Sequence, residues 1–340
     1  MSDTLLITGG AGFIGSAFTG LAADAGYFPL VLDKLTYAGS RANLAYLPEN
    51  AYRLVVGDIG DEALLAELLF EHQPSGIVHF AAESHVDNSI SGPETFIDTN
   101  ITGTYRLLQS ALAYWRDLPD EERTRFRFVN ISTDEVYGAL PLDGKDRFTE
   151  DSPFAPNSPY SASKASADHL ARAWWKTYGL PVITTHCSNN YGPRQHPEKL
   201  IPRMIHCALA GDRLPVYGDG RHVRDWIHVE DHCAGVMLAY RRGAPGEIYN
   251  FGGDAESGNL ALVKQLCALL DQYCPRSDGA RYETQIRFVP DRPGHDERYA
   301  IDDAKAVREL AFGRKYTLAD GLAETVRWYL ANGPDARGKT

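Results

Sequence analysis

The sequence lacks the features of several protein classes. No apolar run in the 340 residues approaches the roughly 18 that a membrane-spanning helix needs. Cysteine is scarce: the five residues are odd in number, scattered and never spaced as C-x-x-C, which disfavours a disulfide framework and a zinc site. Basic residues are in deficit, because 34 Lys and Arg against 45 Asp and Glu give a net charge of −11, so we expect no nucleic-acid partner. An export signal would have a basic stretch and an apolar segment at the start of the chain, and the sequence shows neither. Together, these absences predict a cytoplasmic protein.

What is present is the composition of a folded globular protein, with 44% hydrophobic and 23% charged residues. A chain of 340 residues corresponds to about two domains. Over the first 180 residues, short apolar runs alternate with segments of helical periodicity, which predicts an α/β fold with a parallel sheet covered on both faces. The strand-like runs span 5–8, 29–33, 52–56, 76–80 and 127–131, and the helix-like segments span 12–25, 61–71, 93–115 and 159–178.

The second half of the chain has more proline and a less regular pattern of apolar residues. Prolines at 193, 197, 202 and 215 indicate loops and a smaller, irregular region. Within it, 182–187 still resembles a strand and 228–240 a helix of the first half, so we expect a discontinuous second domain. The predicted division is 1–180 for the sheet domain with segments near 181–192 and 226–253 returning to it, 193–332 mainly for the second domain, and a disordered tail over 333–340.

A glycine-rich turn follows the first predicted strand. Gly9, Gly12 and Gly15 form a G-x-x-G-x-x-G pattern, which is also G-x-G-x-x-G when counted from Gly10. Such glycines allow a tight turn, and the helix that starts there directs free N–H groups and its positive dipole end at a pyrophosphate. Asp33 ends the second strand, where its carboxylate would hold ribose hydroxyls and repel a 2′-phosphate. The pattern predicts a Rossmann-type doubly wound sheet with an NAD site; the alternative is the same turn without a ligand.

Two other strand ends belong to the predicted cofactor site. Asp58 follows the third strand, where hydrogen bonding to adenine and capping of the next helix are equally good interpretations. The fourth strand ends in Phe80-Ala81-Ala82, and small residues there allow close approach of the middle of the cofactor.

A candidate catalytic group lies on the helix predicted over 159–178. Tyr160 and Lys164 are four residues apart and therefore share one face of it. We expect the ammonium to favour the phenolate and to lower the pKa of Tyr160 toward the range of a general base. Thr133 follows the strand over 127–131 at the carboxyl edge of the sheet, where such folds bind ligands, so its hydroxyl is expected beside Tyr160.

Two carboxyl groups, Asp134 and Glu135, follow Thr133 directly. One interpretation is a capping pair at a junction between a loop and a helix. The other is a proton donor and a proton acceptor, because different environments can push the pKa values of neighbouring carboxyl groups apart. That second interpretation requires chemistry beyond hydride transfer.

The motifs resemble those of the extended short-chain dehydrogenase/reductase family, and within it those of the dTDP-glucose 4,6-dehydratases. Thr133-Asp134-Glu135 favours this branch, because relatives similar to UDP-galactose 4-epimerase usually lack an acid pair there. Relatives similar to GDP-mannose dehydratase or UDP-glucuronate decarboxylase commonly have Ser-Glu instead. The matching stretches are ITGGAGFIGS (7–16), DKLTYAG (33–39), HFAAESHVD (79–87), STDEVYG (132–138), SPYSASKASADH (158–169), CSNNYGP (187–193), PEKLIP (197–202), VRDWIHVEDH (223–232), YNFGG (249–253) and DRPGHD (291–296).

The resemblance implies a hydro-lyase of nucleotide-sugar metabolism and deoxysugar biosynthesis that converts dTDP-glucose to dTDP-4-keto-6-deoxyglucose and water. Tyr160 as phenolate would remove the C4 hydroxyl proton while hydride passes from C4 to NAD. Glu135 would then remove the C5 hydrogen, and protonated Asp134 would donate to the departing C6 hydroxyl. Hydride would return to C6, so tightly bound NAD is recycled.

The resemblance also implies site residues by position. Arg224 and Arg292 suit a pyrophosphate, because planar guanidinium groups match phosphate oxygens, and Tyr217 would stack on thymine. The implied catalytic residues are Thr133, Asp134, Glu135, Tyr160 and Lys164. The implied cofactor-binding residues are Gly9, Gly12, Phe13, Ile14, Gly15, Asp33, Lys34, Leu35, Thr36, Asp58, Ile59, Phe80, Ala81, Ala82, Ser84, Thr99, Tyr160, Lys164 and Asn190. The implied substrate-binding residues are Ser84, Thr133, Asn189, Lys199, Leu200, Pro215, Val216, Tyr217, Arg224, Asn259, Arg292 and His295.

Some positions depart from the family pattern. Asn88 stands where many members have Arg, and Arg194 and His196 stand where aromatic residues are common, at the rim of the sugar site. His228 and His232 have a helical metal spacing, but they lie in a family element, so we expect no metal.

Family members usually dimerise through a four-helix bundle, which implies a homodimer built on the helices over 93–115 and 159–178. Leu107, Leu108, Ala111 and Trp115 form part of an apolar stripe for it, although the same stripe could simply cover the sheet. Two functions stay open beside the dehydratase: another NAD-dependent sugar-nucleotide enzyme, such as a 4-epimerase or a dehydratase for a different nucleotide, and a non-catalytic NAD-binding regulator.

Overall fold

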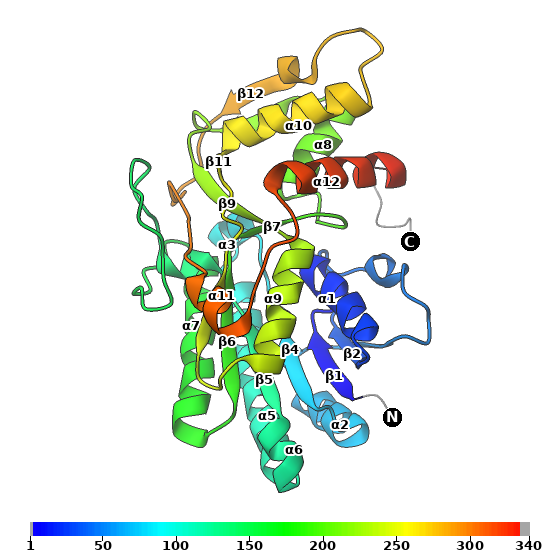
Figure 1. Cartoon of the computed structure of the whole chain (residues 1–340), viewed down its shortest axis with the longest axis vertical. Coiled ribbons are helices and arrows are strands. Elements are labelled where there is room, and N and C mark those ends of the chain that lie inside the picture. Colours follow the sequence, from blue (N-terminus) through cyan, green and yellow to red (C-terminus); the bar gives the residue numbers. More distant parts are fainter. Residues whose placement is uncertain (1–2, 334–340) are drawn as a thin grey trace.

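Figure 1 shows the computed structural model of the chain, which describes residues 3–333. A large parallel sheet with helices on both faces forms the lower part in this view. A smaller part, made mostly of residues after 188, lies above the sheet. No helix in the described range 3–333 combines the length and the apolar character that crossing a membrane requires.

The sheet explains the alternating pattern of the first half of the sequence. Its neighbouring strands are all parallel, and most of their side chains are buried, as expected where helices cover both faces. In register, Thr8 pairs with Leu32 on one side and with His79 on the other. The predicted doubly wound parallel sheet is confirmed. In the described chain it contains seven strands in the order β10 (Ile248–Phe251), β6 (Val182–Cys187), β5 (Arg127–Ile131), β4 (Gly76–His79), β1 (Thr4–Thr8), β2 (Phe28–Asp33) and β3 (Arg53–Val56).

Helices cover the two faces through separate apolar clusters. On one face, Leu65 of α2 and Leu107 of α5 pack with Phe128 of the sheet. On the other face, Phe18 of α1 and Val236 of α9 pack on the strands. The face helices are α2 (Glu62–His72), α5 (Thr104–Asp117) and α7 (Pro159–Ala173) on the first side, and α1 (Phe13–Asp24), α9 (Val229–Arg242) and α11 (Ala304–Leu310) on the second. The remaining elements of this part are η1 (Arg41–Leu44), α3 (Val86–Ser91), α4 (Glu94–Phe96), η2 (Ile97–Gly103), α6 (Asp120–Arg125), η3 (Asp134–Tyr137) and η4 (Trp174–Tyr178).

The smaller part has its own core. Tyr191, Trp226 and Leu266 are buried there in one cluster with residues of α8 and α12. A three-stranded sheet, β11-β9-β7, and a parallel pair, β12 with β8, form its strands. Its elements are β7 (Asn189–Tyr191), α8 (Leu200–Ala210), β8 (Leu214–Tyr217), β9 (Val223–His228), β11 (Glu256–Gly258), α10 (Asn259–Tyr273), η5 (Tyr282–Gln285), β12 (Ile286–Val289) and α12 (Leu318–Asn332).

The long predicted helices differ from the observed ones in a specific way. The segment 93–115 is divided into α4, the π-helical η2 and α5, and the segment 159–178 changes from α7 to the π-helical η4. The segments 182–187 and 228–240 do form a sheet strand and a sheet-covering helix, β6 and α9. The exact domain boundaries stay a prediction. The predicted tail over 333–340 lies outside the described residues from 334 onward.

Candidate active site

The glycine turn between β1 and α1 leaves no room for side chains. Gly9 has a φ of +70°, a left-handed conformation that favours glycine, and a Cβ on it would press against the backbone of Ala81. A Cβ on Gly15 would overlap the carbonyl oxygen of Gly9. Within the described residues, no side chain caps the first turn of α1. Its backbone N–H groups are therefore available to an anion.

Asp33 is held at the end of β2 beside this turn. Its carboxylate accepts hydrogen bonds from the backbone N–H of Ala11 at 2.9 Å and of Leu35 at 2.8 Å. Burial raises the pKa of Asp33, and the two hydrogen bonds act in the opposite direction. Next to it, Lys34 pairs with Asp58 at 2.7 Å. Burial acts to raise the pKa of Asp58, but Lys34 and the N–H of Gly60 outweigh it and lower that pKa.

One pocket of about 300 Å³ runs from the glycine turn to the predicted catalytic residues. It brings together segments that are far apart in the sequence, at the carboxyl ends of the parallel strands. Every predicted cofactor-binding residue except Leu35 lines it, as do all five predicted catalytic residues. Of the residues predicted for substrate alone, Asn189 and Lys199 line it. His196, which the sequence analysis placed at the rim of the sugar site, also lines the pocket. Lining residues that the sequence analysis assigned to no site include Ala38, Gly39, Glu83, Ser132, Cys187, Ser188, Gln195 and Glu198.

Tyr160 and Lys164 lie on the first turns of α7. The helix begins with a reciprocal hydrogen-bonded cap between Ser158 and Ser161, which fixes the position of both side chains. Tyr160 shares a hydrogen bond with Thr133 that acts to lower its pKa, but burial and the neighbouring Glu135 raise the pKa of Tyr160 well above its ordinary value. The prediction that Lys164 sets a low Tyr160 pKa is therefore wrong for this structure. The ammonium of Lys164 instead donates to the carbonyl oxygen of Ile131 at 2.7 Å.

Asp134 and Glu135 begin the short helix η3 and lie in the pocket. The hydroxyl of Thr133, rather than a carboxylate, caps this helix by accepting from the N–H of Glu135 at 3.3 Å. Burial raises the pKa of Asp134 well above its ordinary value, and the charge of Glu135 adds to that effect. Asp134 Oδ2 is buried and has no hydrogen-bond partner within residues 3–333.

Glu135 has a different electrostatic environment from Asp134. Burial raises its pKa too, but Arg292, Arg224 and Lys199 act to lower it. The three cations favour the charged form of Glu135. Asp134 is thus the group that keeps its proton, and Glu135 is the group that more readily becomes a carboxylate.

A buried network behind the pocket was missed by the sequence analysis. The carboxylate of Asp168 accepts from Ser132 Oγ at 2.7 Å and from Asn130 Nδ2 at 2.8 Å, and His186 Nε2 lies 3.1 Å from it. Asp168 is one helical turn beyond Lys164 on α7, so the spacing Tyr160, Lys164, Asp168 was the available signal. The network ties the catalytic helix to strands β5 and β6.

Lys199 is the predicted substrate residue with the clearest place in the pocket. Its ammonium donates to the carbonyl oxygen of Ser84 at 2.8 Å, which joins the start of α8 to the end of β4.

Eight of the predicted substrate residues do not line the pocket. Arg292 Nη1 pairs with Asp87 at 3.1 Å, and the hydroxyl of Tyr217 donates to the same carboxylate at 3.4 Å. Arg224 is buried, donates to the carbonyl oxygen of Asp296 at 2.9 Å and packs against a tyrosine ring. The charges of both arginines nevertheless act to lower the pKa of Glu135. The residues that do not line the pocket are Leu200, Pro215, Val216, Tyr217, Arg224, Asn259, Arg292 and His295.

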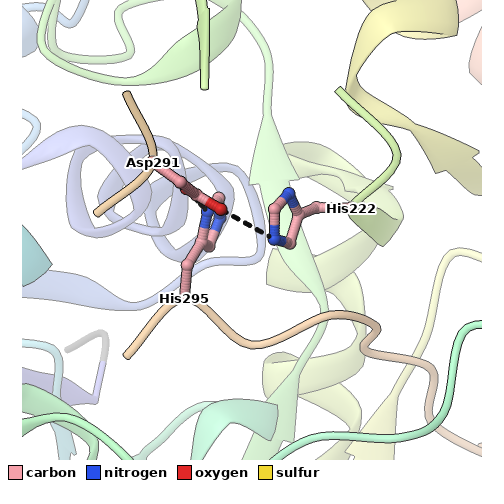
Figure 2. Close-up of side chains that lie close together, drawn as sticks. All are labelled: His222, Asp291 and His295. Atoms are coloured by element: carbon pink, nitrogen blue, oxygen red, sulfur yellow. Dashed lines mark hydrogen bonds and ion pairs between the residues drawn. The ribbon is translucent and has the colours of Figure 1, made fainter. Parts of the chain in front are cut away.

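His295 belongs to a compact group with His222 and Asp291, which Figure 2 shows. His295 Nδ1 lies 2.6 Å and His222 Nε2 3.3 Å from oxygens of Asp291, and the two imidazole rings are stacked with centroids 3.8 Å apart. These ligand types suit zinc. However, an imidazole binds a metal in its own ring plane, and the rings are within 16° of parallel, so an ion in the plane of one ring lies well off the plane of the other. The arrangement fits a hydrogen-bonded stack better than a metal centre, and the expectation of no metal stays a prediction.

The comparisons with known proteins agree with this site. A profile of the GDP-mannose 4,6 dehydratase family matches residues 6–325. A dTDP-glucose 4,6-dehydratase of Xanthomonas campestris pv. campestris is 57% identical over 330 residues, which cover 97% of this chain and 93% of that protein. One from Escherichia coli is 49% identical over 339 residues, which cover 96% and 94%.

Solved structures give the same result. The dTDP-glucose 4,6-dehydratase DesIV from Streptomyces venezuelae, crystallised with NAD, has a TM-score of 0.87 at 48% identity and covers 97% of both chains. A UDP-glucose 4-epimerase from Thermotoga maritima has a TM-score of 0.85 but only 28% identity, covering 97% of this chain and 99% of that one. Together with the acid pair in the pocket, these similarities show that the chain belongs to the dTDP-glucose 4,6-dehydratase family of the short-chain dehydrogenases/reductases.

Proposed function

We propose that the protein converts dTDP-glucose to dTDP-4-keto-6-deoxyglucose and water with NAD that stays bound and is regenerated in each turnover. The observation that carries the proposal is the pair of buried carboxyl groups, Asp134 and Glu135, in the same pocket as Tyr160 and the glycine turn. An enzyme that only moves hydride has no use for a second acid-base pair.

The residues around the glycine turn fit NAD. The backbone of Gly9 to Gly15 leaves space for a pyrophosphate at the start of α1, and the fixed carboxylate of Asp33 suits the ribose hydroxyls. When bound, NAD supplies a hydride acceptor for C4, a hydride donor for C6 and a positive charge that favours the phenolate of Tyr160.

Three side chains carry the proton transfers in this proposal. Tyr160 removes the C4 hydroxyl proton, with Thr133 as its hydrogen-bond partner. Glu135, whose charged form the nearby cations favour, removes the C5 proton. Asp134, whose proton burial retains, donates to the C6 hydroxyl so that it leaves as water.

Cationic side chains on the second part of the chain suit the diphosphate of the substrate. Lys199 lines the pocket, and the charges of Arg224 and Arg292 act on Glu135, which lines it too. Arg292 would exchange its ion pair with Asp87 for the phosphate oxygens. We also propose the domain division of the sequence analysis, with 1–180 and its returning segments binding NAD and 193–332 mainly binding the sugar nucleotide.

We propose a homodimer that forms through a four-helix bundle of α5 and α7. Ile97 on η2 is 51% exposed, and Tyr105 on α5 and Tyr178 on η4 are each 42% exposed. Tyr105 contacts the buried Trp174 edge to face at 5.8 Å, and Trp174 contacts Tyr178 at 5.4 Å, so Tyr105 and Tyr178 belong to one aromatic group that joins α5 to η4. A sedimentation mass of two chains supports the dimer, and a mass of one chain rules it out.

A cytoplasmic location is also proposed, because all five cysteines within the described chain are free thiols.

The function is tested by incubating the purified protein with dTDP-glucose and no external oxidant. We expect a 4-keto-6-deoxy product, detected by mass spectrometry as the loss of one water. Parallel reactions with UDP-, GDP- and CDP-glucose establish the nucleotide, and a faster reaction with one of them contradicts the assignment to dTDP-glucose. Formation of dTDP-galactose would indicate an epimerase, and no reaction by protein that retains NAD would indicate a non-catalytic protein.

A further inference from the structure

Two loops meet across the rim of the pocket on its cofactor side. One loop follows β2 and includes Tyr37 and Tyr46; the other follows β7 and includes Arg194 and His196. The guanidinium carbon of Arg194 lies 4.3 Å from the centre of the Tyr46 ring. The rings of Tyr37 and His196 meet edge to face at 5.4 Å. We call these two contacts the clasp.

The first half of the clasp is anchored to the cofactor-binding turn. The hydroxyl of Tyr46 donates to the carbonyl oxygen of Ser16 in α1 at 2.9 Å. Asn43, on the same loop, donates to the carbonyl oxygen of Ala11 in the glycine turn at 2.9 Å. Movement of this loop is therefore coupled to the backbone that would hold the pyrophosphate.

The second half is anchored to the smaller part of the chain. Gln195 donates to the carbonyl oxygen of Asn190 at 2.8 Å, and its own carbonyl oxygen accepts from the hydroxyl of Tyr329 in α12 at 2.7 Å. Arg194 has a φ of +67°, a conformation that residues other than glycine rarely adopt. Such a conformation persists only where the surroundings hold it, and here it directs the side chain of Arg194 onto Tyr46.

Both loops contribute residues to the lining of the same pocket, and His196 is the clasp side chain among them. Lys34, Thr36 and Gly39 line it from the first loop, and Gln195 and His196 line it from the second. A dinucleotide seated on the glycine turn would therefore lie beneath the contacts that join the loops. The loops must separate before such a ligand can leave on this side.

We infer that the clasp retains NAD in the pocket between turnovers, with Arg194, Tyr46, His196 and Tyr37 acting as positioning residues. This inference rests on the proposed function, because only a cofactor that is reoxidised in place needs to stay bound. If the reduced cofactor left before C6 accepted the hydride, the oxidised sugar would remain in the pocket without its reductant. Retention of the cofactor thus ensures that the hydride is available for C6 after the sugar has been oxidised at C4.

The test measures NAD loss directly. Wild-type protein and the variants R194A, H196A and R194A/H196A are loaded with NAD, diluted and filtered over time, and the cofactor in each filtrate is quantified by chromatography. The cation–aromatic contact of Arg194 and the edge-to-face ring contact of His196 each correspond to about a threefold change in a rate, so we expect the dissociation rate to rise about threefold in each single variant and about tenfold in the double variant.

Matched variants separate retention from a general structural effect. Y46F keeps the ring but loses the hydrogen bond to Ser16, and Y46L loses both, so we expect Y46L to release NAD faster than Y46F. H196F keeps a ring against Tyr37 and should retain NAD better than H196A. R241A removes the cation–aromatic contact between Arg241 and Tyr27, 5.2 Å apart and outside the pocket lining, and should release NAD at the wild-type rate. Thermal unfolding of the cofactor-free proteins checks that each variant folds.

The outcomes are distinguishable. If wild-type protein retains NAD but R194A/H196A and Y46L release it no faster than R241A, the clasp is overturned and the proposed function stands. If wild-type protein binds no NAD at all, the proposed function fails, and the clasp fails with it.

Discussion

Removal of the Asp168 carboxylate tests whether the buried network behind the pocket holds the catalytic helix in place. Asp168 is 4% exposed and serves Ser132, Asn130 and His186 at once. An asparagine in its place keeps the shape and can still accept from Asn130, while its amide can donate to Ser132. D168N therefore loses mainly the strength of charge-assisted hydrogen bonds, and we expect it to be destabilised by about 2 kcal/mol.

D168A should be more damaging, because it leaves all three partners buried without their acceptor. Leaving buried polar groups unsatisfied costs about 1–3 kcal/mol per group, with partial relaxation, so we expect about 4 kcal/mol in total. For a chain of this size 1 kcal/mol corresponds to about 2 °C, so the midpoint of thermal unfolding should fall by about 4 °C in D168N and about 8 °C in D168A.

The assay is thermal unfolding followed by circular dichroism on the cofactor-free protein. D120A, which removes the highly exposed carboxylate paired with Arg123 on α6, is the control and should change the midpoint by no more than about 2 °C. If D168A lowers the midpoint no more than D120A, the network is not a structural support. We also expect the kcat of D168N to fall more than its KM changes, because Asp168 acts through Lys164 and Ser132 rather than on the substrate.

The remaining predictions concern the glycine turn, the Thr133 hydroxyl and a buried histidine. G15A should fail to retain NAD, because its Cβ would overlap the Gly9 carbonyl oxygen, whereas G313A, with open space around the Cβ, should retain it; equal NAD content in the two would contradict the geometry. T133V should lose about 1 kcal/mol of stability and most of its kcat, since it removes the cap of η3 and the partner of Tyr160, and T133S should recover both; an unaffected kcat in T133V would refute this role. Burial lowers the pKa of His79 to about 3, below its unfolded value near 6.5, so the folded state binds fewer protons than the unfolded state between these two pH values. The folded state therefore loses stability as the pH falls from about 6.5 toward 3, by up to about 1.4 kcal/mol per pH unit. Urea unfolding between pH 7 and pH 4 should therefore show a shallower loss for H79Q than for wild-type protein, and parallel curves would contradict it.

Much of the sheet could be predicted because its strands carry local signals. The runs that became β1, β2 and β5 are apolar and short, and the glycine turn and Asp33 follow them at fixed spacing. The π-helical segments η2 and η4 could not be predicted. An apolar stripe in the sequence does not show whether backbone hydrogen bonds join residues four apart, as in an α-helix, or five apart, as in a π-helix.

The site was predictable where residues are close in sequence and less so where the fold assembles them. Tyr160 and Lys164 were found from their spacing, but the direction of the Tyr160 pKa depends on burial and on Glu135, which come from tertiary packing. Asp168 was missed because its partners lie on β5, just after β5 and on β6, 18 to 38 residues away. The pairing of Arg292 with Asp87, 205 residues apart, was likewise outside the reach of motif spacing.

The most direct measurement of the account follows the fate of dTDP-glucose in deuterated water with wild-type protein, D134N and E135Q. Wild-type protein should give the 4-keto-6-deoxy product with solvent deuterium at C5, seen by nuclear magnetic resonance. E135Q should accumulate reduced cofactor on the protein, seen as the absorbance of the reduced nicotinamide, and its sugar should not exchange the C5 hydrogen for deuterium. D134N should exchange the C5 hydrogen but eliminate water slowly. Dehydration by D134N and E135Q at the wild-type rate would show that the buried carboxyl pair does not carry the elimination.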